Sequence, residues 1–331
     1  MNSDAYIRKI EPEKWSEWDA FALAQRDGTL FHSSLWLNAQ PETETEIFGL
    51  YKAGQLIGGT ALAVKKRWGQ LLIPQPRMTP YYGPVFSDAL VLNSSLPAAC
   101  QLLLSEVYAR YDAFTFNLPP QAVQTAQTFC ALMPQQLPAG TCRGMRTNRI
   151  SGRQPEILIE SYSGTSQRRY IRRAIKNREL KAEVSTDFEL LYSLSEESFR
   201  TSGRKHPYPK KDFLKLASCL HEHGLAHCIV VRYGTEAVAA YWVPFDRHTA
   251  YYIASGIRQK YRHLHAGPFA LHLMISFAME QQLVFDFEGS MIENINRFFQ
   301  TFGPEMSGYV HFKSVHSSMV RYLSNLKLIR F

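Results

Sequence analysis

Residues 283–313 read LVFDFEGSMIENINRFFQTFGPEMSGYVHFK and carry the strongest fold signal of the chain. The apolar run 284–287 predicts a short strand that ends in two carboxylates, Asp286 and Glu288. Gly289 predicts the end of this strand, and an aromatic-rich helix is expected to follow. A carboxylate at a strand end is well placed to direct an acid or base into a cleft, so this stretch is also the first candidate site.

Beyond this stretch, the chain shows a weak internal duplication. Residues 47–64 and 228–245 both predict a strand, a glycine-centred turn and a second strand, with Gly54 and Gly234 at the turns. Residues 111–120 take the place in the first half that the opening stretch has in the second, each behind a predicted helix. Each half therefore predicts an α/β unit with a mixed sheet, because hairpins are antiparallel and strand–helix–strand crossovers are parallel. Chance similarity of two α/β halves is the alternative.

The length of 331 residues allows two domains, which we expect at residues 1–150 and 151–331. A hydrophobic fraction of 45% and a charged fraction of 20% are typical of a globular protein. No run approaches the roughly 20 apolar residues that span a bilayer, and the polar N-terminus lacks a signal core, so a cytoplasmic location is expected. The five cysteines lack a CxxC pair and are expected to stay reduced, and no metal site is expected.

The net charge of +8 indicates anionic partners, and a basic helix is predicted at residues 165–181. Arg168, Arg172 and Lys176 share one face of this helix. They are candidate contacts for a phosphate-bearing ligand such as tRNA. The alternative is a solvated face on a helix whose apolar side packs between the domains.

Several stretches, taken in order, resemble the FemAB-like branch of the GNAT acyltransferase superfamily. DFEGS and FFQTFG lie in the opening stretch, while LFHSSLW, TPYYGPVF and EESFRTSGRKHPYPK begin at residues 30, 79 and 196. The resemblance implies two tandem GNAT-like domains with an α/β, mixed-sheet fold. It covers most of the chain, although the sequence lacks the coiled-coil arm of the classical FemABX transferases.

In the GNAT superfamily, backbone N–H groups of a glycine-rich loop before a helix bind the pyrophosphate of the acyl donor. The matching residues here are Arg262, His263, His265, Ala266 and Gly267. Two histidines stand where glycine is favoured, which puts tight coenzyme A binding in doubt. The resemblance therefore implies acyl-CoA or aminoacyl-tRNA as a donor co-substrate, with no tightly bound cofactor.

Acyl transfer to an amine needs a base for the amine proton, and Glu288 and Asp286 are the candidates. The structural alternative is that either carboxylate caps the next helix or pairs with Arg297. A tyrosine often serves as the acid in this superfamily, but the corresponding residue is Phe299, which cannot transfer a proton. The candidates to replace it are Tyr251, Tyr252 and Tyr309.

The resemblance implies an enzyme that moves an acyl or aminoacyl group onto an amine, for example that of a cell-envelope precursor. A groove between the domains is expected to bind this acceptor through Tyr81, Tyr82, Arg204, Lys205 and Tyr252. The alternative is a non-catalytic GNAT-like protein that binds a nucleotide-like or nucleic-acid ligand through the basic helix. The missing acid and the degenerate donor loop favour this alternative.

Overall fold

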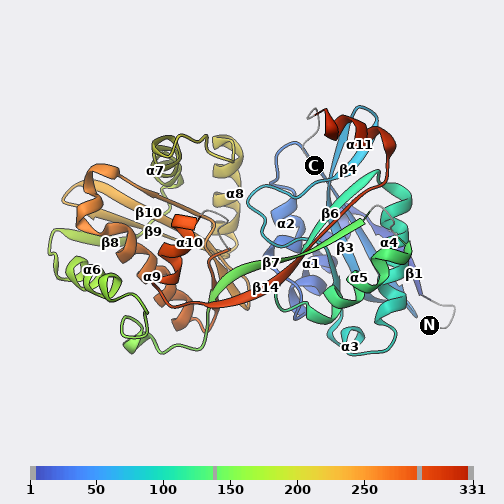
Figure 1. The fold of residues 1–331 in the computed structure, drawn as a ribbon, viewed down its shortest axis with the longest axis horizontal. Coiled ribbons are helices and arrows are strands. Elements are labelled where there is room, and N and C mark those ends of the chain that lie inside the picture. The colour runs from blue at the N-terminus through green and yellow to red at the C-terminus, as the bar shows by residue number, and fades with distance from the viewer. Residues whose placement is uncertain (1–4, 137–139, 289–292, 327–331) are drawn as a thin grey trace. The chain divides into compact units, whose positions relative to one another are not determined.

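The structure, a computed structural model, divides into two compact units (Figure 1). Unit 1 comprises residues 1–145 and 308–331, and unit 2 comprises residues 146–307. The residues that the structure describes are 5–136, 140–288 and 293–326.

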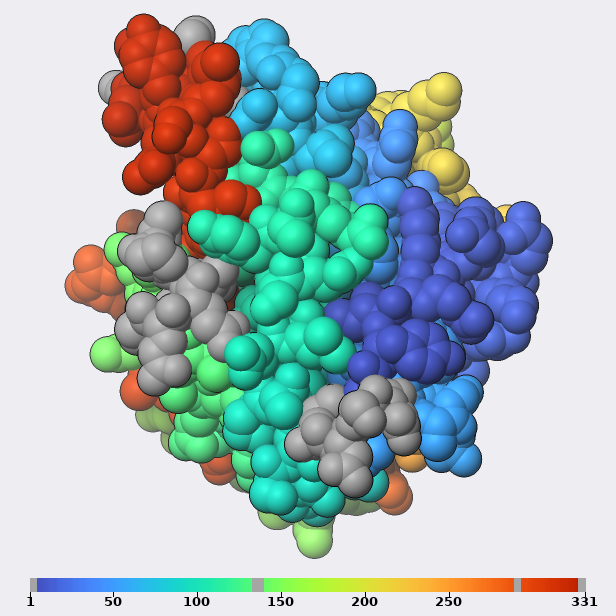
Figure 2. All heavy atoms as spheres, turned by 90° about the vertical axis from the view of Figure 1, so that its right-hand side faces the viewer, coloured from blue at the N-terminus to red at the C-terminus, as the bar shows by residue number. Residues whose placement is uncertain are grey.

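The chain passes between the units within two strands, β7 (Gly140–Ile150) and β14 (Glu305–Val315). The boundary expected at residue 150 lies close to the first passage. The C-terminal residues, expected in the second domain, belong instead to unit 1, because β14 pairs antiparallel with β6 (Ala113–Leu118). Helix α11 (Ser318–Asn325) adds to this by burying Val320 against the sheet, and Figure 2 shows it beside the β3–β4 region.

Unit 1 is built on strands in the order β1-β2-β3-β4-β6-β14. β4 and β6 are parallel, and the other neighbours are antiparallel. Its further strands are β1 (Ala5–Ile10), β2 (Glu44–Lys52), β3 (Gln55–Arg67), β4 (Gln70–Ile73) and β5 (Pro84–Phe86), the last paired with β3. Its helices are α1 (Trp15–Ala24), α2 (Ser34–Leu37), α3 (Asp88–Val91), α4 (Leu96–Arg110) and α5 (Val123–Gln136), with 3-10 turns η1 (Pro12–Lys14) and η2 (Leu30–His32).

Unit 2 divides its strands between two groups. An antiparallel sheet has the order β12-β10-β9-β8, and β11 pairs in parallel with β13, which pairs antiparallel with the end of β7. These strands are β8 (Leu180–Val184), β9 (Ala226–Tyr233), β10 (Glu236–Pro244), β11 (Thr249–Tyr251), β12 (Ala254–Ile257) and β13 (Val284–Asp286). Residues 252 and 253 join β11 to β12, so the two groups separate at this point, which we call the strand gap.

The helices of unit 2 surround this arrangement. They are η3 (Pro155–Ile157), α6 (Thr165–Lys176), α7 (Phe188–Thr201), α8 (Lys210–Glu222), η4 (Gln259–Leu264), α9 (Ala266–Glu280) and α10 (Glu293–Gln300). α9 is the central one, because Leu271, Met274 and Ile275 are fully buried in the core of the unit. α9 is the helix that the sequence predicts ahead of the strand at residues 284–287.

The two units share one strand order. In each, a hairpin (β2–β3 or β9–β10) leads to further strands and then, through a helix, to a parallel partner (β4–β6 or β11–β13). The hairpins turn at Gly54 and Gly234, whose φ angles of 77° and 58° favour glycine. The expected pair of mixed α/β units is therefore confirmed.

The basic helix is shorter than the expected span of residues 165–181. α6 ends at Lys176 because Asn177 has an extended backbone. The Asn177 side chain then accepts a 3.1 Å hydrogen bond from the N–H of Glu179 and stabilises a turn. The next residues form β8, which pairs with β9, so sheet formation replaces the last helical turn.

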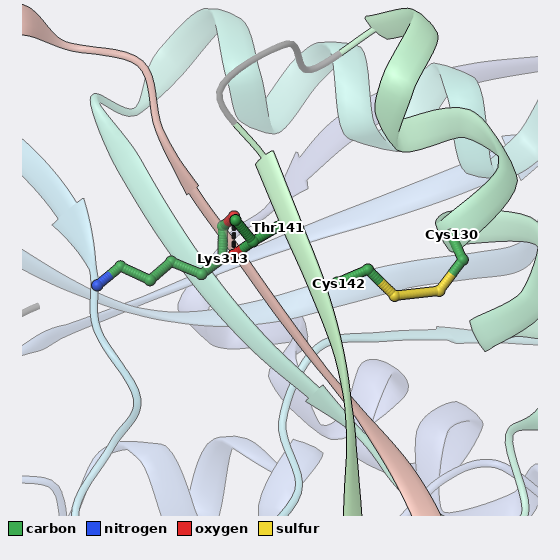
Figure 3. Close-up of a disulfide and its surroundings, with 4 residues drawn as sticks. All are labelled: Cys130, Thr141, Cys142 and Lys313. Atoms are coloured by element: carbon green, nitrogen blue, oxygen red, sulfur yellow. Dashed lines mark hydrogen bonds between the residues drawn. A yellow bond between two sulfur atoms is a disulfide. The ribbon is translucent and has the colours of Figure 1, made fainter.

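The expectation that all cysteines stay reduced was wrong for one pair. Cys130 in α5 and Cys142 in β7 form a disulfide, with Cα atoms 6.1 Å apart (Figure 3). They are 12 residues apart in sequence, and the reversal of the chain between helix and strand brings them together. Beside them, the hydroxyl of Thr141 donates a 3.4 Å hydrogen bond to the carbonyl of Lys313 in β14. The cysteines at positions 100, 219 and 228 are free.

Candidate functional site

The strand gap of unit 2 brings both predicted carboxylates next to a tyrosine. Tyr251 at the end of β11 lies opposite Asp286 at the end of β13, and the N–H of Tyr252 donates a 2.9 Å hydrogen bond to the Asp286 carbonyl. Glu288 follows two residues later. Gly289, expected to end the strand, lies outside the described residues.

The Asp286 side chain is fully buried and fully engaged. Its carboxylate accepts hydrogen bonds from the Thr147 hydroxyl (2.6 Å) and the N–H of Glu288 (2.8 Å). It also pairs with the guanidinium of Arg149 at 3.2 Å. Because Arg149 and Thr147 come from β7, this carboxylate ties β7 to the end of β13. Asp286 therefore pairs with Arg149, while Arg297 pairs with Glu293 of its own helix.

The carboxyl of Glu288 differs from that of Asp286. Its Oε1 atom is buried and has no hydrogen-bond partner among the residues that the structure describes. Burial raises the pKa of this carboxyl well above its usual value, and the Asp286 carboxylate raises it further. The backbone of Glu288 has a φ of 60°, a left-handed conformation that a glutamate rarely adopts. An acid that has a buried oxygen unpaired in the described structure and a strained backbone is typical of functional sites.

Tyr252 lies beside Glu288 at the strand gap. Its hydroxyl is 2.7 Å from the hydroxyl of Ser255, and its ring stacks on Tyr241. Burial raises the pKa of the Tyr252 phenol, and the carboxylate of Glu288 contributes to the rise. The phenol therefore keeps its proton at neutral pH. Phe299 packs edge-on against the Tyr252 ring, so an apolar side chain lies beside the phenol.

The other tyrosines weighed as acids have different surroundings. The hydroxyl of Tyr251 donates a 2.7 Å hydrogen bond to the carboxylate of Asp246 and is fully buried. Tyr309 belongs to unit 1, where its ring contacts Tyr81. Of the three, Tyr252 is therefore the one that shares its surroundings with Glu288.

Side-chain amides form a hydrogen-bond network between β7 and α10 that the sequence analysis did not predict. The side chain of Asn148 in β7 bonds to Asn296 and to Gln300, each at 2.8 Å. The Asn148 carbonyl also accepts a 2.9 Å hydrogen bond from the N–H of Phe287. Asn296 and Gln300 are four residues apart on one face of α10, and this spacing was the available signal. The contribution of β7 depends on pairing between distant segments, which the sequence does not reveal.

The predicted donor loop leads into the N-terminus of α9. His265 has a left-handed backbone with φ 59°, and Ala266 and Gly267 are buried in the first turn. A Cβ atom on Gly267 would lie 2.4 Å from the end of the Ile257 side chain, so a larger residue here would require that side chain to shift. Arg262 and His263 are exposed in η4 just before this turn.

Helix α6 brings two arginines to the donor loop. The ring of Tyr170 stacks on His265 at 4.0 Å between ring centres. Burial lowers the pKa of His265, and the positive charges of Arg173, His263 and Arg169 lower it further, which shows that these cations gather around the start of α9. Cations together with a helix N-terminus favour binding of an anion.

The arginines predicted for the phosphate contact have other partners. Arg168 donates to the carbonyl of Tyr162 and, at 3.3 Å, to the hydroxyl of Thr165. Arg172 pairs with Glu160 at 2.6 Å, and Lys176 is exposed. The three basic residues lie along α6 as predicted, but the arginine charges that act on His265 of the donor loop are those of the neighbouring Arg169 and Arg173.

The predicted acceptor residues are divided between the units. Tyr81 and Tyr82 lie in the core of unit 1, where the Tyr82 hydroxyl accepts a 2.5 Å hydrogen bond from the N–H of Ala63. Arg204 and Lys205 are exposed in unit 2 between α7 and α8, and Tyr252 lies at the strand gap. Within the described ranges, no group of three or more His, Cys, Asp or Glu side chains is arranged to hold a metal ion.

Comparison with known proteins agrees with this geometry. A family model described as an acetyltransferase (GNAT) domain matches residues 165–294. The crystal structure of FemX is similar over 97% of this chain and 100% of its own, with a TM-score of 0.72 and 14% identity. The chain has a tandem GNAT fold. The expected FemAB-like architecture is thus confirmed, and the strand gap is that of its second GNAT unit.

Two further structures are similar to this chain over most of its length. A tandem GNAT protein from the clavulanic acid biosynthesis pathway covers 95% of this chain and 99% of its own, with a TM-score of 0.52 and 12% identity. L-PGS from Bacillus licheniformis covers 97% and 98%, with a TM-score of 0.52 and 14% identity. No curated protein sequence matches the chain. None of the helices in the described ranges has the length and apolarity that a bilayer span requires.

Proposed function

We propose that this tandem GNAT protein is an acyltransferase that moves an acyl or aminoacyl group onto an amine. The match of residues 165–294 to a GNAT domain supports the reaction class. The observation that carries the proposal is the Glu288 carboxyl, whose Oε1 atom is buried and has no partner among the described residues, and which lies beside a protonated Tyr252. Either a CoA thioester or an aminoacyl-tRNA fits as donor.

In this proposal, the two residues move the two protons of the reaction. The amine nitrogen attacks the donor carbonyl, and the carbon–sulfur or carbon–oxygen bond to the carrier breaks. Glu288 in its ionised form accepts the proton from the amine, and Tyr252 donates a proton to the leaving thiolate or alkoxide. The Asp286 side chain positions Glu288 by accepting a hydrogen bond from its backbone N–H. A backbone N–H is the usual donor to the forming oxyanion in this superfamily.

Donor phosphates are proposed to bind at the start of α9. The loop residues Arg262, His263, His265, Ala266 and Gly267 supply the helix N-terminus and part of the charge. Arg169 and Arg173 of α6 supply the rest, because both lie close enough to His265 to lower its pKa. The neighbouring stripe of Arg168, Arg172 and Lys176 extends the positive surface and suits a long polyanion such as tRNA.

The acceptor is proposed to be an amine of a cell-envelope precursor, on the strength of the FemAB-like resemblance. Arg204 and Lys205 are exposed cations in unit 2, and Tyr252 lies at the reacting centre, so these three remain the proposed acceptor contacts. Tyr81 and Tyr82 are buried in unit 1 and act in this proposal by holding the local backbone. A cytoplasmic location fits both donors.

A second candidate is a non-catalytic GNAT-like protein that binds a nucleotide-like or nucleic-acid ligand. Phe299 favours it, because the ring replaces a frequent acid of the superfamily and fills the space beside Tyr252. The two candidates differ in one measurable property, which is transfer of the acyl group.

The test incubates the purified protein with acyl-CoA donors or with charged tRNA and a panel of amines. Release of free CoA, or transfer of a labelled aminoacyl group, is measured. We expect Glu288→Gln to lower turnover about 100-fold or more while donor binding is unchanged. The matched control is Glu293→Gln, because this exposed glutamate of α10 pairs only with nearby Arg297 in the described structure. Donor binding without any transfer by the wild-type protein would establish the non-catalytic candidate instead.

A further inference from the structure

Helix α11 of unit 1 leaves part of its apolar surface exposed. The fold uses its inner side, because Val320 is fully buried against the sheet and Leu323 packs on the same cluster. Three further apolar side chains are more than half exposed: Met319 (53%), Tyr322 (62%) and Leu326 (51%). Their helical spacing of three and four residues places them along one side of α11. The core of unit 1 therefore does not account for this outer stripe.

A fourth exposed apolar side chain comes from the tip of the β3–β4 hairpin. Trp68 is 53% exposed and, with Gly69, forms a two-residue turn in which both φ angles are positive. Such a turn favours Asn-Gly, and a bulky side chain with positive φ is strained. The tryptophan is thus neither required by the turn nor used by the core.

The hairpin tip and α11 lie side by side in unit 1 (Figures 1 and 2). The hydroxyl of Ser317, the N-cap of α11, donates a hydrogen bond to the side-chain oxygen of Gln70, two residues after Trp68. Exposed apolar side chains that are scattered singly need no explanation, whereas a cluster of them marks an interaction site. The cluster consists of Trp68, Met319, Tyr322 and Leu326, and we call it the α11 patch.

Exposed cations accompany the α11 patch. Lys66 and Arg67 come directly before Trp68, and Arg321 lies on α11. The guanidinium of Arg67 lies 4.5 Å from the centre of the Trp68 ring, so a cation and an aromatic ring are presented together. Residues 65–70 and 316–326 contain no aspartate or glutamate.

In the described structure, the hairpin and α11 contact two carboxylates from other segments. Glu42 pairs with Lys65, and the carboxylate of Asp112 accepts a 2.8 Å hydrogen bond from the N–H of Leu71. Once Glu42 is paired, the three cations beside the α11 patch face one carboxylate. The patch is therefore positive and complementary to an anionic surface.

The side chains of the α11 patch favour a lipid surface as its partner. Trp and Tyr are enriched where the acyl chains of a bilayer meet its headgroups, and Lys and Arg beside them attract anionic lipids. A nucleic acid would use the cations but leave Met319 and Leu326 in water. A symmetric contact with a second copy would bring the like charges of both copies together.

We propose that the α11 patch docks unit 1 on the surface of an anionic membrane. With eight residues, α11 is too short to cross a bilayer, so it lies in the headgroup region with its outer stripe toward the acyl chains. Apolar insertion and charge attraction act together in this arrangement, as reversible docking requires. The proposed acyl transfer uses the strand gap of unit 2 and leaves the α11 patch without a role.

The test measures co-sedimentation of the full-length protein with lipid vesicles. Vesicles of phosphatidylcholine alone are compared with vesicles that also contain phosphatidylglycerol. We expect binding to the anionic vesicles to be about tenfold tighter or more, and to weaken as the salt concentration rises. Equal binding to both vesicles, or binding to neither, would overturn the proposal.

Apolar variants separate the α11 patch from the general positive charge of the protein. Trp68→Ser and Tyr322→Ser should each weaken vesicle binding about tenfold, because each removes an apolar side chain from the interface. The matched control is Leu92→Ser, which alters a 79% exposed side chain of unit 1 after α3, at the opposite end of the unit from α11 (Figure 1). This control should bind like the wild type. If Trp68→Ser and Tyr322→Ser also bind like the wild type, the proposal is wrong.

Charge variants use the two ends of the long strand β3. Lys66→Gln should weaken binding to anionic vesicles about fivefold, because one cation leaves the membrane surface. Lys52→Gln removes the same charge at the other end, where Lys52 pairs with the first residue of β3, and should have no effect. Equal losses in the two variants would contradict docking through the α11 patch.

Tryptophan fluorescence shows which surface meets the lipid. Among the described residues, Trp68 is the exposed member of the five tryptophans. Vesicles with brominated acyl chains should therefore quench the wild type more strongly than Trp68→Phe, which keeps an aromatic ring. Equal quenching would place another surface against the bilayer and overturn the proposal.

Sedimentation without lipid tests the other occupant of the patch. Self-association that is lost in Tyr322→Ser, together with no vesicle binding by the wild type, would assign the α11 patch to a second copy of the chain instead. None of these readouts depends on acyl transfer.

Discussion

The backbone N–H of Glu288 donates a 2.8 Å hydrogen bond to the side-chain carboxylate of Asp286. From the sequence, Asp286 and Glu288 are alternative candidates for the base. In the structure, the Asp286 side chain holds the backbone of Glu288 in place. Asp286 also holds Thr147 and Arg149, so its oxygens are engaged. Glu288 is thereby held in a left-handed conformation at the strand gap with an oxygen left unpaired in the described structure.

Loss of the Asp286 carboxylate should destabilise unit 2. Asp286→Ala removes the buried partner of Arg149 and the acceptor of two hydrogen bonds, so we expect a loss of about 3–5 kcal/mol in the free energy of unfolding. Urea denaturation measures it. The control is Glu293→Ala, which breaks an exposed ion pair with Arg297 and should cost at most about 1 kcal/mol. Equal losses in the two variants would show that the buried contacts of Asp286 contribute no more stability than an exposed ion pair.

The pH dependence of stability should report the burial of Glu288. Its pKa is raised in the folded state, so folding favours the protonated form. This contribution is complete below the pKa of the unfolded chain and is lost as the pH rises through the folded value. Glu288→Gln should therefore become more stable relative to the wild type as the pH increases. Thermal unfolding at pH 5 and pH 9 measures the difference in stability between the variant and the wild type. A difference that is the same at both pH values would show that the carboxyl is exposed to water.

Two pairs of arginines on α6 should contribute differently to donor binding. Neutralising Arg169 and Arg173 should weaken binding of coenzyme A and flatten its salt dependence, because both cations lie at the start of α9. Neutralising Arg168 and Arg172 should have a smaller effect, since they already bond to Tyr162 and Glu160. Both double variants remove two charges from one helix, so each is the control for the other. The opposite ranking would support the stripe predicted from the sequence.

The disulfide should stabilise unit 1 under oxidising conditions. Cys130 and Cys142 close a short loop, for which the loss of unfolded-state entropy corresponds to about 3 kcal/mol. Reduction with dithiothreitol should lower the free energy of unfolding of the wild type by about this amount. Cys142→Ser should be insensitive to dithiothreitol, while Cys219→Ser, which alters a free cysteine, should respond like the wild type. A wild type that does not respond would show that the pair contributes no stability.

Acid should destabilise the fold through two buried histidines. Burial lowers the pKa of His32 and of His272 to about 4, so each contributes stability that is present above pH 6.5 and lost as the pH falls toward 4. The loss is about 3 kcal/mol for each histidine, by the usual 1.36 kcal/mol per pKa unit. Asp27 offsets part of it, because burial raises its pKa to about 6. His272→Gln should flatten the measured dependence of unfolding free energy on pH between 4 and 6.5.

Local patterns in the sequence were enough to predict most elements of the fold. Gly54 and Gly234 mark the two hairpins, since a turn with positive φ favours glycine wherever it occurs. The apolar spacing of α9 and the strand before Glu288 are likewise properties of short segments. The short segments on either side of α9 were also enough to predict the donor loop and both carboxylates of the candidate site.

Other features depend on pairing between residues far apart in the chain. Arg149 meets Asp286 because β7 adds to the edge of β13, and residues 308–331 join unit 1 because β14 pairs with β6. Strand pairing at long range is chosen by the burial of whole sheet faces, and no short stretch of sequence contains that information. Helix and turn signals act over a few residues, so the sequence alone predicts the elements, while tertiary packing determines which of their side chains meet.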